Sequence, residues 1–141
     1  MRADVSSETI HASCVEIDGL AVLLEGRSGE GKSDLALRLI DRGAKLISDD
    51  YTICQREGRG LLAFPPPNIA GKIEVRGIGI IDMPWVERVP IVLIVGILET
   101  PPRMPEGFGK RRIAGVDIAA VDLPALEPSA AIKVELALKR V

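Results

Sequence analysis

Eight consecutive residues form the pattern with the clearest chemistry in this chain. They match G-x-x-x-x-G-K-[ST] and are Gly26, Arg27, Ser28, Gly29, Glu30, Gly31, Lys32 and Ser33. Glycines at these positions let backbone N–H groups wrap a polyphosphate at a helix N-terminus. Lys32 would then place a cation on the β- and γ-phosphates, and the Ser33 hydroxyl can ligate Mg²⁺. The motif predicts a nucleotide-binding phosphate loop, and the alternative is a glycine-rich turn.

Acidic residues at the ends of expected strands are candidates for the remaining work of phosphoryl transfer. In that chemistry one carboxylate holds Mg²⁺, directly or through water, and another positions or deprotonates the acceptor. Asp49 and Asp50 follow the strand after the expected phosphate-loop helix. Adjacent aspartates repel each other, and a simple turn cap would use one of them. We therefore expect this pair at the phosphate site, Asp82 as a turn or strand-end cap, and Glu99 in solvent.

Two further polar positions are ambiguous from the residues alone. His11 is the single histidine of the chain, and a lone histidine is more often structural than catalytic. Glu74 and Arg76 alternate with apolar residues, so that both would lie on one face of a strand. That face is either solvated or lines the active site.

The composition describes one globular domain over residues 1–141, with 47% hydrophobic and 27% charged residues and a net charge of −2. The longest apolar run, 91–98, is far shorter than the roughly 20 residues that span a bilayer. The N-terminus lacks a secretory pattern, so we expect a cytoplasmic protein without a membrane partner. Balanced charge and 3% aromatic residues argue against nucleic acid as a partner. Cys14 and Cys54 are expected to be reduced, buried thiols.

An α/β fold with a mixed sheet, flanking helices and hairpins is expected around the motif. Two strands, 13–17 and 20–25, should form a hairpin at Asp18-Gly19, a sequence suited to a type I′ turn. The second of them runs into the phosphate loop, and a helix at 33–42 and a strand at 44–48 follow. The later elements are expected to be a hairpin over 51–64, a strand region over 71–83, strands at 89–98 and 116–123, a mobile basic loop at 101–112, and a helix at 129–140 with a Ser129 cap and a basic last turn.

These features together resemble the HPr kinase/phosphorylase family, the bacterial serine kinases of the phosphocarrier protein HPr of the phosphotransferase system. The resemblance covers about residues 8–83: His11 ahead of a hairpin, GRSGEGKSDLAL, RGAKLISDD and KIEVRGIGIIDM. It implies a P-loop kinase domain that uses ATP or pyrophosphate with Mg²⁺. It further implies transfer to a serine of HPr, with the phosphorylase reaction as a second activity, and so a role in regulating carbon and nitrogen metabolism.

The resemblance also implies roles for individual residues. The loop from Gly26 to Ser33 would hold the nucleotide, with Ser33 and Glu74 as Mg²⁺ ligands. Asp50 is similar in position to the carboxylate that takes the proton from the target serine and returns it in the reverse reaction. His11 resembles the active-site histidine of the family. Arg103 resembles an arginine near the phosphates, and Arg111 and Arg112 are the alternatives.

Departures from the longer family members leave other properties open. This chain resembles the short form of the family, found in α-proteobacteria, which has the catalytic domain alone. After residue 83 it has Pro84-Trp85-Val86-Glu87-Arg88 in place of a glycine-rich segment. Assembly into a homo-oligomer and the balance of the two reactions therefore stay open. The alternative function is a module that senses nucleotide or phosphate and regulates a partner without efficient transfer; a small-molecule kinase is a third hypothesis.

Overall fold

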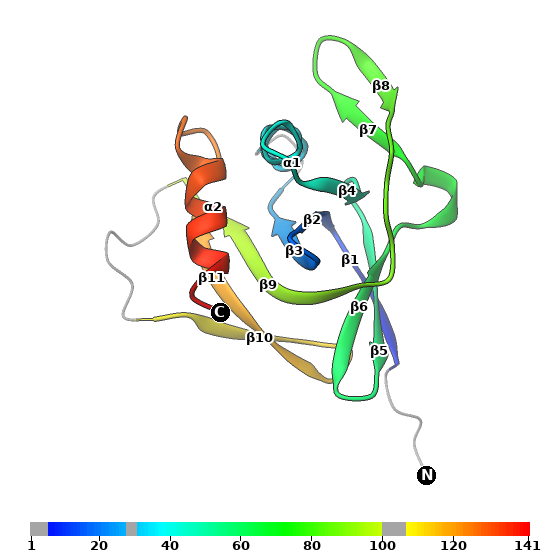
Figure 1. Ribbon diagram of the computed structural model, residues 1–141, viewed down its shortest axis with the longest axis vertical. Helices are drawn as coiled ribbons and strands as arrows, with labels where there is room; N and C mark the ends of the chain where they lie inside the picture. Colours follow the sequence, from blue (N-terminus) through cyan, green and yellow to red (C-terminus); the bar gives the residue numbers. More distant parts are fainter. Residues whose placement is uncertain (1–5, 28–30, 100–106) are drawn as a thin grey trace.

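The computed structural model describes residues 6–27, 31–99 and 107–141. Within these ranges the chain alternates strands with two helices in an α/β arrangement (Figure 1). The elements, in chain order, are β1 (Ser7–Ile10), β2 (Ala12–Ile17), β3 (Leu20–Glu25), α1 (Lys32–Asp41), β4 (Lys45–Ser48), β5 (Thr52–Glu57), β6 (Gly60–Phe64), the 3₁₀ turn η1 (Pro67–Ile69), β7 (Lys72–Val75), β8 (Gly79–Asp82), β9 (Val89–Ile97), β10 (Gly109–Ile113), β11 (Val116–Leu123) and α2 (Ala130–Leu138).

A mixed sheet branches at β9. In the described part of the chain it has nine strands in the order β1-β5-β6-β9-β3-β2-β4, with β11 also on β9 and β10 on β11. The first residues of β9 pair antiparallel with β6, whereas its later residues pair parallel with β11 and with β3. The carboxyl ends of β3, β9 and β11 therefore share one edge of the sheet. Ligands of open α/β sheets bind at that edge.

Two apolar cores form because successive side chains of a strand point to opposite faces. Along β3, Val22 and Leu24 face the helices, whereas Ala21 and Leu23 lie in the second core, inside the curled sheet. The near-continuous apolar sequence of this strand is consistent with its being covered on both faces. A strand buried this way fixes the position at which the phosphate loop begins.

Helices α1 and α2 cover one side of the sheet and touch each other. Leu35, Ala36 and Leu39 give α1 its buried face, and Asp34 pairs with Arg38 at 3.1 Å, one helical turn away. Gly43, with φ of +111°, follows the helix in the left-handed conformation that ends many helices. Exposed Arg42 also contacts Glu135 of α2 through a bidentate ion pair.

The β7–β8 hairpin is a separate two-stranded sheet beside α1 (Figure 1). Ile73 is buried in the helix-side core and anchors the hairpin, while Ile78 and Ile80 are exposed. Lys72 and Asp82 close its open end with an ion pair of 2.9 Å. Asp82 is thus the last residue of a strand, in agreement with the strand-end position expected for it.

Several sequence expectations were wrong in detail. A strand, β1, precedes His11 and pairs with β5. The sequence does not predict this strand because its short polar run has no alternation of apolar residues. Basic residues expected in a loop form β10, because pairing with β11 overrides their low strand propensity. Ser129 makes no side-chain cap bond, and the last turn of α2 has no basic residue. Arg76 lies in the β7–β8 turn, outside the strand expected to carry it.

Other expectations were confirmed. The hairpin at Asp18-Gly19, the hairpin of β5 and β6, and the strands β4, β9 and β11 are all present. Cys14 and Cys54 are buried free thiols, and Glu99 is exposed. Among the described residues, none of the helices is both long and apolar enough to cross a bilayer.

Candidate functional site

The expected phosphate loop leaves the end of β3 and leads into α1. Gly31 precedes α1 with φ of +97°, a left-handed conformation that glycine adopts without strain. The backbone N–H groups of the first turn of α1 have no acceptors within the helix, and such groups bind anions. Residues 28–30 lie outside the described residues, so Ser28, Gly29 and Glu30 stay predictions.

Lys32 is the first residue of α1, and its side chain is only 4% exposed. A lysine buried to this degree needs a partner for its charge. Its Nζ lies 3.4 Å from Oδ1 of Asp50. The ammonium group is therefore held at the β4–β5 turn, where the expected pair of aspartates lies.

Asp49 is buried and is held by donors from three elements. Its Oδ1 accepts hydrogen bonds from Ser13 Oγ of β2 at 3.0 Å and from Ser33 Oγ of α1 at 2.6 Å. Its Oδ2 accepts one from the backbone N–H of Glu74 in β7 at 2.9 Å. This carboxylate therefore ties the helix, the sheet and the hairpin together around the phosphate loop.

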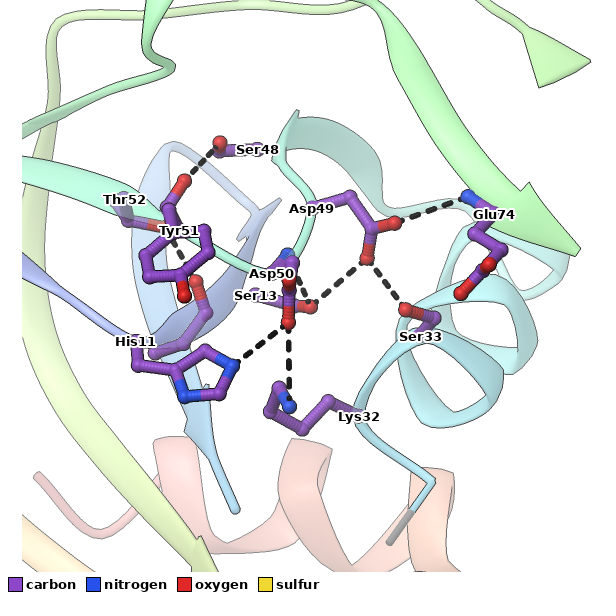
Figure 2. A network of polar contacts seen from close by, with 11 residues as sticks. His11, Ser13, Lys32, Ser33, Ser48, Asp49, Asp50, Tyr51, Thr52 and Glu74 are labelled. Carbon is purple, nitrogen blue, oxygen red and sulfur yellow. Dashed lines mark hydrogen bonds and ion pairs between the residues drawn. The ribbon is translucent and has the colours of Figure 1, made fainter. Parts of the chain in front are cut away.

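Asp50 points away from these partners, toward Lys32 and His11 (Figure 2). Its φ is +69°, a left-handed conformation that aspartate tolerates better than most residues. The backbone N–H of Asp50 donates to Ser13 Oγ at 3.0 Å, which holds this turn. The side chain stays 48% exposed, so that one carboxylate faces solvent where an acceptor hydroxyl could approach.

His11 lies between β1 and β2, with its Nε2 2.9 Å from Oδ1 of Asp50. The ring stacks on Tyr51, with centroids 4.7 Å apart and planes 17° from parallel. Figure 2 shows both rings on the same side of Asp50. The structure thus brings the lone histidine to the carboxylate pair.

The residues expected to hold a magnesium ion lie together beside the phosphate loop. Ser33 Oγ is bonded to Asp49, and so is the backbone N–H of Glu74 in β7. The side chain of Glu74 is exposed. Mg²⁺ uses one or two protein ligands and completes its octahedron with phosphate oxygens and waters. The hydroxyl and carboxylate oxygens here are the donors this ion prefers, and the described residues hold no cluster of three His, Cys, Asp or Glu side chains that would suit a tighter metal site. The donor set therefore fits Mg²⁺ bound together with phosphate.

A pocket of about 680 Å³ opens over this constellation. Its lining runs from the first turn of α1 across Asp49, Asp50 and Tyr51 to the β7–β8 hairpin, and it also includes Leu126. The size is that of a small-molecule site. Both Glu74 and Arg76 line it, so the two polar residues left ambiguous by the sequence are at the site, Glu74 from the strand and Arg76 from the turn.

None of the three arginines that the resemblance suggests near the phosphates is among the described residues that line the pocket. Arg103 lies outside the described residues, and its role stays a prediction. Arg111 of β10 makes a bidentate ion pair with Glu25, which raises the pKa of its guanidinium. Arg112 contacts Asp117 at 3.1 Å. Neither alternative arginine lines the pocket.

Two residues of the site were missed from the sequence. Ser13 was read only as part of a strand, and the one available signal was a hydroxyl in an otherwise apolar run. Tyr51 was read as the start of a hairpin, although tyrosine directly after a candidate catalytic pair is a chemically informative position. Ser13 contacts Asp49 and Asp50, and Tyr51 contacts His11. These contacts depend on how the strands pack, which the sequence does not show.

Comparison with known proteins identifies the family to which the chain belongs. The family model for the HPr serine kinase C-terminal domain matches residues 4–86. The chain belongs to this family. The matched region contains every described residue of the His11, Lys32, Asp49 and Asp50 network, which supports the resemblance found in the sequence.

Individual members of the family align with more of this chain than the family model does. An HPr kinase/phosphorylase of Chlorobium phaeobacteroides is 34% identical over 81% of this chain, and one of Lactobacillus acidophilus is 36% identical over 82%. In both cases the chain spans 40% of the relative's length. The solved Hpr(Ser) kinase/phosphatase from Coxiella burnetii superposes with a TM-score of 0.82 at 29% identity, over 94% of this chain and 89% of that one. The fold is therefore that of an HPr kinase domain.

Proposed function

We propose that this protein is an ATP-dependent serine kinase of the phosphocarrier protein HPr, with the phosphorylase reaction through the same site. One observation carries the proposal: Oδ1 of Asp50 lies 2.9 Å from His11 Nε2 and 3.4 Å from Lys32 Nζ, beside the phosphate loop. A half-exposed carboxylate next to a phosphate-binding lysine is placed to act on an acceptor hydroxyl. The names of the relatives supply the carrier protein as acceptor.

The forward reaction follows from the weak nucleophilicity of a serine hydroxyl. Asp50 orients that hydroxyl and takes its proton as the oxygen attacks the γ-phosphorus. The bond between this phosphorus and the β–γ bridging oxygen breaks, leaving ADP and phosphoserine. Lys32 stabilises charge on the phosphate oxygens during transfer, and His11 contacts the same oxygen of Asp50 and fixes its direction.

The phosphorylase reaction uses the same groups, with inorganic phosphate as the nucleophile. An oxygen of inorganic phosphate attacks the phosphorus of phosphoserine, and the ester bond to the serine oxygen breaks. Asp50 returns its proton to that oxygen, and the products are pyrophosphate and free serine. This reaction is the exact reverse of phosphoryl transfer from pyrophosphate to serine, so microscopic reversibility requires those two directions to share one site.

The cofactors of this proposal are ATP or pyrophosphate with Mg²⁺. Residues 26–33 would hold the phosphates, and Ser33 and Glu74, with Asp49 beside them, would hold the ion. When bound, Mg²⁺ supplies charge neutralisation at the phosphate oxygens. Arg103 would add a further cation, as the resemblance implies.

The setting of the protein is proposed on the same basis. We place it in the cytoplasm, as one catalytic domain over residues 1–141, and its assembly stays open. Its partners would be HPr and a nucleotide, with neither nucleic acid nor membrane. The nine-stranded sheet and its two cores join residues from 7 to 138, which supports a single domain.

The test is phosphate transfer with purified HPr, Mg²⁺ and γ-labelled ATP. The wild-type chain should label a serine of HPr, and Asp50→Asn should reduce the rate at least about 100-fold. Asp82→Asn, an exposed carboxylate that does not line the pocket, is the matched control and should keep full activity.

The reverse reaction is checked with phosphoserine-HPr and inorganic phosphate, with pyrophosphate measured as product. If nucleotide binds to the wild type and no label moves in either direction, the kinase proposal is wrong. A nucleotide-sensing module that regulates a partner would then be the better interpretation.

A further inference from the structure

The loop between β11 and α2, residues 124–129, carries an exposed apolar side chain beside the phosphate site. Leu126 is 81% exposed, more than any other large apolar residue that the structure describes. It nevertheless lines the pocket that holds Lys32, Ser33 and Asp50. An exposed leucine at the rim of a phosphate site offers a contact to whatever is attached to the phosphates.

The β11–α2 loop is held firmly against α1. Arg38 Nη1 donates to the carbonyl oxygen of Glu127 at 2.9 Å, and the same guanidinium donates to the carbonyl oxygen of Ala125. Leu126 lies between these two anchored carbonyls. The fixed backbone keeps Leu126 at the rim of the pocket, so that only its side chain has to be ordered when a ligand arrives.

The phosphate loop also approaches this segment closely. A Cβ added to Gly31 would lie 3.4 Å from Ala125 Cβ and 3.7 Å from Leu126 Cδ2. The last glycine before Lys32 therefore runs directly beneath Leu126. A group that extends from phosphates bound here meets this leucine at once.

The direction of the bound chain follows from the two sides of α1. Asp49 is bonded to the backbone of Glu74 in the β7–β8 hairpin and to Ser33, and these residues mark the reacting end of the polyphosphate. Figure 1 shows α1 between that hairpin and α2, and α1 contacts β7 and α2 alike. Leu126 precedes α2 and follows β11, whose carboxyl end shares an edge with that of β3. The nonreacting end of the ligand therefore points toward the β11–α2 loop.

We infer that Leu126 contacts the nucleoside of a bound nucleoside triphosphate and is a specificity-determining residue that favours it over inorganic polyphosphate. The inference rests on the proposed function and goes beyond it, because it assigns the site of the base and ribose. Apolar contact with a base or ribose requires no polar partner, and the removal of a leucine side chain from water gives it favourable free energy. Inorganic polyphosphate has no group that reaches this position.

The experiment compares two ligands on two variants by isothermal calorimetry with Mg²⁺ present. Leu126→Ser should weaken ATP binding about tenfold and leave inorganic tripolyphosphate within about twofold of the wild type. Leu136→Ser is the matched control, since Leu136 is a 56% exposed leucine of α2 that does not line the pocket. It should change neither affinity, and both variants should unfold at the wild-type urea concentration.

Three results would overturn the inference. One is unchanged ATP affinity in Leu126→Ser, and another is an equal loss for both ligands, which would mean a disturbed phosphate loop. The third is a wild-type chain that binds tripolyphosphate as tightly as ATP, which leaves the phosphate site standing without a nucleoside contact. A wild type that binds neither ligand would contradict the proposed function itself, and this outcome is distinct from the other three.

Discussion

Asp49 and Asp50 are neighbours in sequence, yet their carboxylates face different partners. Asp49 is buried and bonded to Ser13, Ser33 and the backbone of Glu74. Asp50 adopts a positive φ and turns its half-exposed side chain to Lys32 and His11. One turn of backbone thereby separates a buried carboxylate that connects three elements from a half-exposed one beside Lys32 and His11.

Tyr51 is predicted to act as a positioning residue at this scale, because its ring stacks on His11 and not on any reacting group. Tyr51→Ala should lower kcat for transfer to HPr about tenfold with the KM for ATP unchanged, since aromatic stacking contributes about 0.5–1.5 kcal/mol. Tyr51→Phe keeps the ring and should restore the rate. Full activity of Tyr51→Ala, or failure of the phenylalanine variant, would contradict this role.

The hydroxyl of Ser13 connects strand β2 to the β4–β5 turn, which lies more than 30 residues later in the chain. Ser13 of β2 donates to Asp49 Oδ1 and accepts from the backbone N–H of Asp50. It thereby fixes the β4–β5 turn against β2, while Thr52 repeats the connection with a bond to the carbonyl of Ala12 at 2.8 Å. The position of the two aspartates is thus set by strand packing as much as by their own turn.

Loss of that hydroxyl should cost stability because it leaves buried polar groups without a partner. We expect Ser13→Ala to lower the free energy of unfolding by about 1–3 kcal/mol, measured by urea titration. Ser7→Ala, on the exposed face of β1, is the matched control and should change it by less than about 0.5 kcal/mol. A Ser13→Ala protein as stable as the control would show that water replaces the hydroxyl.

The whole molecule is a curled sheet with a core on each face. The inner core contains Cys14 and Cys54, and burial raises the pKa of both thiols, that of Cys54 to about 12. The nearby charge of Glu8 adds to the shift at Cys54. In the unfolded chain both thiols titrate near their ordinary pKa, about 8.5.

This difference predicts a pH dependence with a definite sign. A folded pKa above the unfolded one gives stability that is fully present below about pH 8.5 and is lost as pH rises toward about 12. Urea titrations at pH 7 and pH 10 should show a larger decline for the wild type than for the Cys14→Ala/Cys54→Ala variant. At pH 8 a thiol reagent should label the wild type only after unfolding, and rapid labelling of the native protein would contradict the burial of these thiols.

Local chemistry made the phosphate loop, its strand and helix, and the aspartate pair predictable from sequence. A glycine-rich loop before an amphipathic run has few other structures available, because glycine spacing and apolar period are local properties. Family resemblance added roles for His11 and Glu74 that their own positions left open. The strand β1 and the strand β10 escaped prediction because pairing with distant partners, and not propensity, forms them.

The sequence by itself determined which groups could bind phosphate and carry a proton. Only the tertiary structure decided that His11, Ser13 and Asp50, from positions up to 39 residues apart, share one hydrogen-bonded network. It also decided that Leu126 borders the same pocket as Lys32. The physical reason is that strand order and helix packing are collective outcomes of burying two cores, whereas the chemistry of a side chain belongs to the residue alone.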